Sequence, residues 1–535
     1  MGIEELKNWL ASTSSSSSKI LLCLVPLVLV SGFASLLLQK GSNLGLLYTS
    51  SSSHTVKNSS LLVAKERDSP IDSQVRHFVR TFLPFYCMSE PNYVVFLLIL
   101  VFLSIQQTGK DENKPDMAIS GNLNNSSIKA NESTDNTVKP RRRRIRSSLV
   151  RVEEGLRKAR LAIREAPNGT RLKDPDYIPD GPIYNNAKAF HRSYLEMEKR
   201  LKIFVYEEGE LPLFHDGPCR LLYTMEGQFI NKMEVNHKFR THNPHKAHLF
   251  YLPYSVTRLV QYNWVKGTHM NNLGTIVLDY VNLIATKHPF WNRSHGADHF
   301  MLSCHDWGPA TSFYVPGLVK SSIRALCNAN TSERFNPMRD VSIPEISLKS
   351  DRLEGLIGGL SPSKRSILAF FAGGNHGFVR PILFDHWEKK DPDIQVHSYL
   401  PRSVSYYDQM RQSKYCLCPS GYEVASPRIV EALYNGCVPV LISKTYVPPF
   451  SDVLNWKSFA VIVSLEEIPD LKKILMGIPE RKYIRMQKRV IQVRRHFELY
   501  VNPKRFDVFH MILHSIWLRR LNVRVSNDPG EILLD

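Results

Sequence analysis

The chain has 535 residues, of which 43% are hydrophobic and 10% aromatic, and this composition excludes a wholly disordered protein. Its length is sufficient for two or more domains. The formal net charge of +19 is typical of a nucleic-acid-binding protein, but much of the excess lies in one arginine-rich run at 141–146. The basic signal is therefore local and does not describe the whole chain.

The first predicted element is a membrane anchor at residues 20–38. This segment carries no charged side chain and is close to the roughly 20 residues that a helix needs to cross a bilayer. Lys7 and Lys19 precede it, so we expect residues 1–19 to stay cytosolic and the anchor to remain uncleaved. A cleaved signal peptide is the alternative, but its apolar core is usually about 7–15 residues long and ends at a small-residue cleavage site, which is not evident here.

Residues 39–195 are predicted to form a luminal stem, because the segment up to about 140 is rich in Ser, Asn and Lys. A second apolar run at 93–105 is shorter than a membrane span and is more typical of a buried or interfacial segment. If it did cross the membrane, the rest of the chain would return to the cytosol. Sequons on both sides of this run argue against that return. The candidate N-glycosylation sites are Asn58, Asn124, Asn125, Asn131, Asn168, Asn292 and Asn330.

The basic stretch at 141–165 is predicted to be a helix, because its apolar residues recur at helical spacing. These residues are Leu149, Val152, Leu156, Ala159 and Ile163. We interpret this helix as a solvated part of the stem. A helix that binds the membrane surface or a partner protein is the alternative.

From residue 196 short apolar strands alternate with helical segments, and this pattern predicts an α/β fold with parallel sheets. The predicted strands of a first unit, 196–360, lie at 202–206, 247–254 and 298–306. Those of a second unit, 361–470, lie at 366–374, 394–400, 415–419, 437–443 and 459–464. Two such doubly wound, Rossmann-like units are expected to face a cleft between them. The helical and basic region 471–535 is expected to pack back across the first unit.

A glycine-rich turn follows the first predicted strand of the second unit. Gly373 and Gly374 allow the backbone to approach a ligand closely, and Arg380 follows within reach of a phosphate group. The turn does not match the dinucleotide-binding pattern G-x-G-x-x-G, so by itself it is a weak signal.

A second glycine turn in the same unit strengthens that signal. Gly421 follows the strand at 415–419, and Arg428 and Glu431 lie on a helix predicted at 427–434. A cation in the first turn of a helix opposes the helix dipole, and this placement is understandable if an anion binds there. An ordinary Arg–Glu surface pair is the alternative. Two phosphate-suited loops in one unit would enclose a diphosphate.

His305 and Asp306 end the strand predicted at 298–306, at the edge of the inferred cleft. Either side chain is suited to remove the proton from an acceptor hydroxyl as a general base. A structural hydrogen-bonded turn beneath the cleft is the alternative interpretation of this pair.

No metal site is predicted. Two Asp-x-Asp pairs, at 174–176 and 391–393, follow no strand and are better explained as proline turns. Cys416 and Cys418 lack a matching CxxC or His pair, so buried or disulfide-bonded cysteines are expected instead. The chain has eight cysteines, which is compatible with one or more disulfides of undetermined connectivity.

Several segments, in this order, resemble the exostosin-like glycosyltransferases of family 47, and most closely their plant cell-wall branch. They are KIFVYEEGELP, GADHFMLSCHDWGP, DVSIPE at 340–345, AFFAGGNHGFVRP and YCLCPSGYEVASPRIVEALYNGCVPVLIS. The resemblance implies a single-pass type II Golgi membrane protein with a luminal body of the two-domain GT-B fold. It also implies an inverting mechanism, a nucleotide-sugar donor that is usually UDP-linked, and no obligatory cofactor or bound metal.

By position, the donor-site motif of that family falls on a set of residues in the second unit. The set is Gly421, Ser426, Arg428 and Glu431, with Arg380 as a phosphate ligand from the preceding glycine loop. The resemblance marks Glu431 as functionally essential, and we assign it to ribose recognition because the donor unit carries it. His305 and Asp306 match a pair that only some branches of the family contain.

The leading hypothesis is a Golgi glycosyltransferase that adds one sugar from a UDP-sugar to a cell-wall polysaccharide such as pectin or hemicellulose. Its expected partners are the UDP-sugar, the polysaccharide acceptor, the Golgi membrane and other glycosyltransferases in a complex, but no nucleic acid. The rival is a non-catalytic, membrane-anchored scaffold of the same fold that binds glycan. A basic nucleic-acid-binding protein ranks third.

Overall fold

The computed structural model describes residues 139–170, 172–263, 271–349, 353, 355–526 and 532–534. The predicted cytosolic tail, the anchor at 20–38, the apolar run at 93–105 and the sequons at Asn58, Asn124, Asn125 and Asn131 lie outside these ranges. Within them, no helix combines the length and the apolar character that crossing a membrane requires.

The first sheet has parallel strands that follow the order of the chain, β1-β2-β3-β4-β5. They are β1 (Ile203–Val205), β2 (Leu249–Tyr251), β3 (His299–Ser303), β4 (Ile323–Leu326) and β5 (Val341–Ser342). The strands predicted near 202–206, 247–254 and 298–306 are confirmed, and β4 and β5 are additional. The strand order never reverses, so the doubly wound arrangement expected for this unit is wrong.

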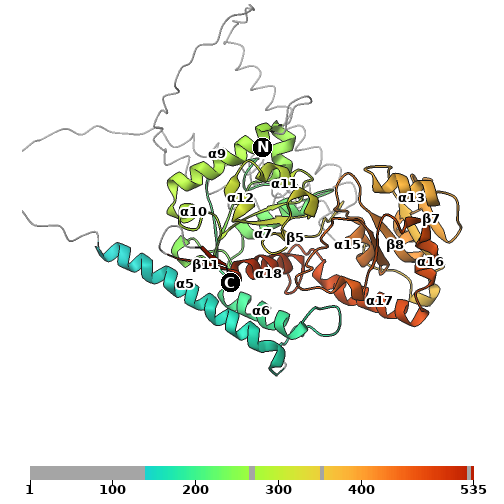
Figure 1. Cartoon of the computed structure of the whole chain (residues 1–535), viewed down its shortest axis with the longest axis horizontal. Helices are drawn as coiled ribbons and strands as arrows, with labels where there is room; N and C mark the ends of the chain where they lie inside the picture. The colour runs from blue at the N-terminus through green and yellow to red at the C-terminus, as the bar shows by residue number, and fades with distance from the viewer. Residues whose placement is uncertain are drawn as a thin grey trace, which may run out of the picture. The chain divides into compact units, whose positions relative to one another are not determined.

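Side chains of the first sheet alternate between two hydrophobic cores. In β2, Leu249 and Tyr251 join a cluster with α6, α7 and α18 (Val508–Leu521), whereas Phe250 joins a cluster with α8, α9, α10 and α12. Figure 1 shows α9 and α12 on one side of the sheet and α6 and α18 on the other. Burial on both faces explains why these strands are continuously apolar. The helices are α6 (Ala187–Arg200), α7 (Thr224–Glu234), α8 (Val256–Asn263), α9 (Asn271–Lys287), α10 (Pro289–Ser294), α11 (Gly308–Ser312) and α12 (Pro316–Lys320).

The second sheet is also parallel, with the order β10-β9-β8-β6-β7. Its strands are β6 (Ile367–Ala372), β7 (Ile394–His397), β8 (Ser413–Pro419), β9 (Val438–Ile442) and β10 (Val461–Val463), which confirms all the strands predicted here. The order reverses between β6 and β8, as in doubly wound nucleotide-binding folds. The helices that connect these strands include α13 (Val379–Trp387), α14 (Tyr406–Gln412) and α15 (Arg428–Tyr434).

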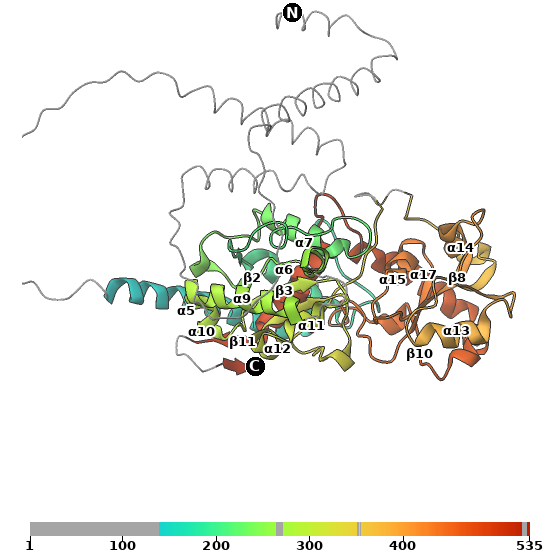
Figure 2. The same cartoon turned by 90° about the horizontal axis from the view of Figure 1, so that it is seen from above.

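The C-terminal region connects the two sheets. Helices α16 (Leu471–Met476) and α17 (Glu480–Val493) belong to the second unit, where α17 contacts α15 and β9. Helix α18 (Val508–Leu521) instead contacts β4, β5 and α6 of the first unit, and Figure 1 shows it between the labels of β5 and α6. In Figure 2, α17 lies with α15 and β8 of the second unit. The region 471–535 was expected to pack back across the first unit, and of its helices only α18 does so.

The predicted basic helix exists as α5 (Lys139–Glu165), but it is not a solvated stem. Leu156 and Ala159 are fully buried in the main core, and the Arg160 guanidinium donates hydrogen bonds to the backbone oxygens of Leu521 and Val523 at 2.6 and 2.8 Å. Val523 belongs to β11 (Val523–Val525), which pairs with β12 (Ile532–Leu534). The folded body thus begins with α5, earlier than the predicted start at 196.

Candidate active site

The two predicted glycine loops meet at the point where the strand order of the second sheet reverses. The loop with Gly373 and Gly374 follows β6, and the loop with Gly421 follows β8, which is the neighbouring strand. In open parallel sheets, ligands bind beyond the carboxyl ends of the strands at such a reversal. The topology therefore places both loops where a nucleotide is expected.

The two loops are in direct contact. Gly377 has a φ of +69°, a backbone conformation that residues with a side chain rarely adopt. A Cβ added to it would lie 1.8 Å from the carbonyl oxygen of Gly421. A Cβ added to Gly421 would itself lie 2.9 Å from Nη2 of Arg380. Glycine at these positions is therefore needed for the loops to approach each other and the guanidinium.

Arg428 is the first residue of α15, and its side chain reaches back to the first loop. Its Nε and Nη2 atoms donate to the carbonyl oxygen of Ala372 at 3.3 and 3.0 Å, and the guanidinium lies 5.1 Å from the ring centroid of Phe371. The alternative of an Arg–Glu surface pair is wrong, because no ion pair joins Arg428 to a described carboxylate within 4.0 Å. The guanidinium instead caps the end of β6.

Arg380, in the first turn of α13, is buried beside Arg428. Its Nη1 atom donates to the carbonyl oxygen of Gly374 at 3.0 Å, whereas its buried Nε has no hydrogen-bond partner among the described residues. Burial, and then the neighbouring positive charge of Arg428, lowers the pKa of Arg380 to about 10. Two guanidiniums with unused donors at one site are suited to a multiply charged anion.

Three further polar groups surround the arginines. Ser420 and Ser426 are buried, and their hydroxyl oxygens have no hydrogen-bond partner within the described part of the chain. Glu431 accepts a hydrogen bond from the Tyr406 hydroxyl at 2.8 Å. Burial raises the pKa of Glu431, although the charge of Arg428 opposes this effect. The structure thus brings together all the donor-site residues that the sequence predicted.

In the first unit, the buried carboxylate of Glu226 holds the loop that follows β3. It accepts five hydrogen bonds, from Ser255 Oγ, Thr257 N, Ser303 Oγ, Cys304 N and His305 N, at 2.6–3.0 Å. A disulfide between Cys304 and Cys327 ties the same loop to the end of β4. The sequence interpretation missed Glu226, because neither a strand end nor a motif marks it.

His305 and Asp306 occupy this loop with different surroundings. His305 Nδ1 accepts the backbone N–H of Trp307 at 3.0 Å, so this nitrogen is engaged in the turn, and burial lowers the pKa of the ring. Burial raises the pKa of Asp306, although the nearby Tyr223 hydroxyl favours its charged form. The structural-turn interpretation therefore fits His305, while the charge of Asp306 acts on Glu423 of the other unit.

Glu345 is a buried carboxyl group that the sequence interpretation did not select. It follows β5 and is 6% exposed. Burial, and then the charge of Asp306, raises its pKa to about 8. The charges of Arg428, Glu431 and Arg380 also affect this pKa. Glu345 is therefore close to candidate residues of both units. The sequence signal was its place at the end of DVSIPE, just beyond a short strand.

The two units also share a polar contact at Asn328. Its Nδ2 atom donates to the carbonyl oxygen of Asp306 at 3.0 Å, to Glu333 at 3.2 Å and to Glu423 at 2.9 Å. Burial, and then the charge of Glu333, raises the pKa of Glu423 to about 8. This contact joins the loop after β3 to the second glycine loop.

Both Asp-x-Asp pairs are turns, as predicted. Asp174 Oδ1 accepts the backbone N–H groups of Asp176 and Tyr177 at 2.9 and 3.2 Å. Asp391 Oδ1 accepts those of Asp393 and Ile394 at 2.8 and 3.1 Å. Asp174 also accepts hydrogen bonds from Arg505 at 2.8 and 2.9 Å, and Asp391 accepts one from Lys472 at 2.7 Å, so both carboxylates have structural roles.

The cysteines and sequons are placed as follows. A second disulfide joins Cys416 in β8 to Cys437 before β9, and Cys418 is buried with a free thiol. Asn168 and Asn292 are exposed, as glycosylation requires. The prediction of Asn330 as a glycosylation site is wrong, because its side chain is buried. The residue is 7% exposed and its Nδ2 donates to Glu333 at 3.2 Å, so this conformation leaves no room for a glycan.

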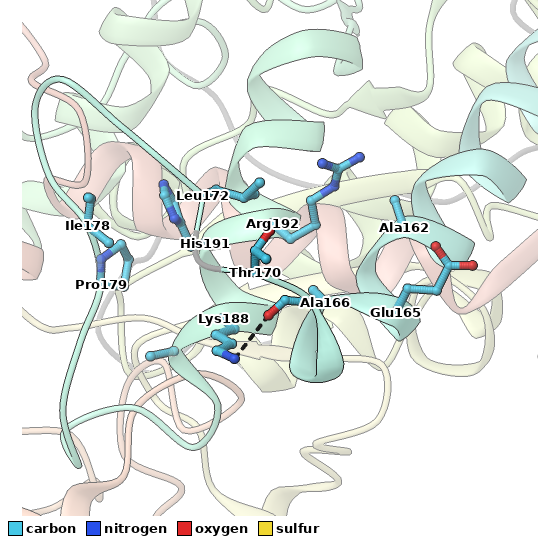
Figure 3. A pocket seen from close by; sticks show the side chains of 12 residues that line it. Ala162, Glu165, Ala166, Thr170, Leu172, Ile178, Pro179, Lys188, His191 and Arg192 are labelled. Atoms are coloured by element: carbon cyan, nitrogen blue, oxygen red, sulfur yellow. Dashed lines mark hydrogen bonds between the residues drawn. The ribbon is translucent and has the colours of Figure 1, made fainter.

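A pocket of about 220 Å³ lies away from this site, between the end of α5 and α6 (Figure 3). Lys188, His191 and Arg192 of α6 line it, and Lys188 Nζ donates to the carbonyl oxygen of Gly169 at 3.0 Å. None of the residues predicted for the donor site or for catalysis belongs to its lining.

Comparison with known proteins finds similarity over most of the chain. Residues 197–478 match the family described as the Exostosin GT47 domain. The chain is 53% identical over 517 residues to a probable glycosyltransferase of Arabidopsis thaliana, covering 96% of each chain. It is 29% identical to a probable beta-1,4-xylosyltransferase of Arabidopsis thaliana, covering 63% of this chain and 86% of the relative. It is also 29% identical to a probable glucuronosyltransferase of Oryza sativa subsp. japonica, covering 63% of this chain and 85% of the relative.

Proposed function

Because this chain belongs to the exostosin GT47 family of glycosyltransferases, we propose that it transfers a sugar from a UDP-sugar to a hydroxyl of a plant cell-wall polysaccharide, with inversion at the anomeric carbon. The observation that carries the donor assignment is the pair Arg380 and Arg428. They lie side by side at the strand-order reversal, without an ion-pair partner among the described residues. A diphosphate would supply the negative charge that neutralises the two guanidiniums.

The donor would lie with its diphosphate against the two guanidiniums and the hydroxyls of Ser420 and Ser426. The glycines at 373, 374 and 421 leave the backbone free of side chains that would block this approach. Glu431 is assigned to the ribose hydroxyls, as a buried carboxyl group that already accepts a hydrogen bond from the Tyr406 hydroxyl. We propose that the arginines neutralise the diphosphate without a metal ion.

In the transfer step, the acceptor oxygen attacks the anomeric carbon from the face opposite the diphosphate. The bond between the anomeric carbon and the phosphate oxygen breaks, and UDP leaves with the electron pair. Negative charge grows on the leaving oxygen, where fixed guanidiniums stabilise it without reorganisation. The acceptor proton passes to a protein base.

We place the reaction in the lumen of the Golgi apparatus, with the predicted segment 20–38 as the anchor. The disulfides Cys304–Cys327 and Cys416–Cys437 support an oxidising compartment. Glycosidase treatment of the expressed full chain should increase its electrophoretic mobility. Replacing the exposed Asn168 and Asn292 by Gln should reduce that change, whereas Asn330→Gln should leave it unaltered. Unchanged mobility of the unmodified chain after treatment would argue against a luminal body.

The donor site is tested by UDP binding to the full chain, measured by calorimetry and by the rise of its melting temperature. Arg380→Ala and Arg428→Ala should each weaken UDP binding about 10- to 100-fold, since a charge-assisted hydrogen bond contributes roughly 1.5–3 kcal/mol. Arg489→Ala is the matched control, because Arg489 lies on α17 of the same unit and bonds only the Ser458 carbonyl among the described residues. Unchanged UDP affinity in both site variants would refute the assignment of Arg380 and Arg428 to the donor site.

The sugar itself is sought with a panel of UDP-sugars. UDP-xylose and UDP-glucuronate come first, because distant relatives of this chain are named as xylosyl- and glucuronosyltransferases. UDP-galactose, UDP-arabinose and UDP-galacturonate complete the panel, with xylan, xyloglucan and pectin oligosaccharides as acceptors. Release of UDP that depends on an acceptor identifies both substrates.

A further inference from the structure

The segment after β5 is held firmly between the two units. The backbone N–H of Ile343 donates to Leu326 at 3.0 Å, which anchors the segment to β4. On the other side, Ser342 Oγ donates to the carbonyl oxygen of Val447 at 2.7 Å, and Ser342 accepts the N–H of Phe450 at 3.1 Å. Both of these partners belong to the second unit. Glu345, three residues beyond Ser342, therefore has a fixed position relative to both units.

Side chains from five segments act on the charge of Glu345. Tyr223 precedes α7, Asp306 follows β3, Arg380 begins α13, Arg428 and Glu431 belong to α15, and Tyr446 follows β9. The first two come from the first unit and the other four from the second. Glu345 is the one acidic residue described here that senses both phosphate-suited arginines together with Asp306.

The carboxyl group of Glu345 also has no hydrogen-bond donor among the described residues, and the residue is 6% exposed. Glu431, by contrast, accepts a hydrogen bond from the Tyr406 hydroxyl at 2.8 Å, and the nearby Tyr223 hydroxyl favours the charged form of Asp306. A buried carboxylate without a donor retains its full capacity to take a proton, whereas a hydrogen-bonded carboxylate is a weaker base.

We propose that Glu345 is the general base of the sugar transfer. The inference rests on the proposed function, since it requires a donor diphosphate on Arg380 and Arg428. An acceptor hydroxyl between Glu345 and the anomeric carbon loses its proton to the carboxylate as its oxygen forms the new glycosidic bond. The bond from the anomeric carbon to the diphosphate breaks at the same time, and UDP leaves with the electron pair.

The electrostatic surroundings match this role. Burial and the neighbouring Asp306 and Glu431 make ionisation of Glu345 less favourable, while Arg428 and Arg380 oppose them, and the balance puts its pKa near 8. A base is most effective when its pKa is close to the working pH. Asp306 then acts as a positioning residue, which keeps Glu345 basic through its charge.

The test uses the full chain and acceptor-dependent UDP release from the UDP-sugar that the panel identifies. Glu345→Gln keeps the size of the side chain and should lower kcat about 10²- to 10⁴-fold, the usual contribution of a general base. UDP binding, measured by calorimetry, should stay within threefold or become tighter. Glu345→Asp should restore part of kcat. Glu333→Gln is the matched control, since it removes another carboxyl near Asp306 and should change kcat less than threefold.

The pH dependence separates a base from a structural residue. In the unmodified enzyme kcat/KM should rise with pH as Glu345 loses its proton, and Glu345→Gln should abolish this rise. A Glu345→Gln variant with kcat within threefold of the unmodified chain, or with the same acid limb, would overturn the proposal. Retained UDP affinity in both Arg380→Ala and Arg428→Ala would refute the donor site instead, and no UDP release by the unmodified chain from any UDP-sugar would overturn both.

Discussion

The guanidinium of Arg428 occupies the space that a side chain at position 373 would need, since a Cβ added to Gly373 would lie 2.1 Å from Nη2 of Arg428. Arg428 belongs to the loop and helix after β8, whereas Gly373 follows β6. The relationship shows that the two glycine loops form a single structure, in which one loop supplies the space and the other supplies the cation.

Replacing Gly373 by Ala should displace the Arg428 guanidinium from the Ala372 carbonyl. We expect UDP affinity to fall at least about tenfold, which corresponds to roughly 1.4 kcal/mol. Isothermal titration calorimetry of the full chain measures this change. Gly358→Ala is the control, because the nearest atom to a Cβ there, Arg411 Nε, is 3.7 Å away. Equal UDP affinity in the two variants would contradict the steric argument.

Gly377→Ala should lower the melting temperature of the chain, through backbone strain and through a clash with Gly421. Gly355 separates these two effects, since its φ of +78° is also positive but no atom lies within 4 Å of an added Cβ. The strain alone costs about 1 kcal/mol. Thermal unfolding should therefore show a larger loss for Gly377→Ala than for Gly355→Ala, and similar losses would mean that the loops separate easily.

Glu226→Gln should destabilise the loop that carries His305 and Asp306. The carboxylate accepts five hydrogen bonds, and an amide nitrogen in its place would face N–H and O–H donors. We expect the free energy of unfolding to fall by about 3 kcal/mol, together with a loss of activity. Urea unfolding measures the first and UDP release the second. Ser255→Ala, which removes one of the five donors, should cost less than half as much.

Stability should decline as the pH falls below 6.5, because three buried histidines stay neutral in the folded state. Burial lowers the pKa values of His248 and His496 to about 3 and that of His514 to about 4. The unfolded chain binds protons at these histidines near pH 6.5, whereas the folded chain does not. Acid therefore favours the unfolded state between pH 6.5 and about 4.

Two buried carboxyls act in the opposite direction. Glu345 and Glu423, with pKa values of about 8, hold protons that the unfolded chain releases above its usual pKa of 4.5. These two groups therefore add stability as the pH falls from 8 towards 4.5. Above pH 6.5 these three histidines no longer contribute, so the two carboxyls should make the melting temperature fall as the pH rises from 6.5 towards 8. His514→Gln should flatten the acid side, and Glu345→Gln the side above pH 6.5. A melting temperature that rises steadily from pH 6.5 to 4 would contradict this assignment.

Much of the fold and of the donor site could be predicted from the sequence, because the signals are local. Apolar runs bounded by glycine and proline predicted all the strands of the second sheet, and the glycines with Arg380 and Arg428 stand directly after β6 and β8. Loops that follow neighbouring parallel strands must meet at one edge of the sheet. Chain order and residue type were therefore sufficient to bring this site together.

Other features depend on contacts between distant segments, and only the tertiary structure decided them. The short strands β4 and β5, the burial of α5 and the pairing of Cys304 with Cys327 each involve partners that no local pattern specifies. Glu345 is the clearest case, since its place at the end of DVSIPE does not by itself indicate a chemical role. It acquires its chemistry because folding excludes water from it and places Asp306, Arg380 and Arg428 around it. Residue identity supplied the carboxyl group, and packing of the two units determined its proton affinity.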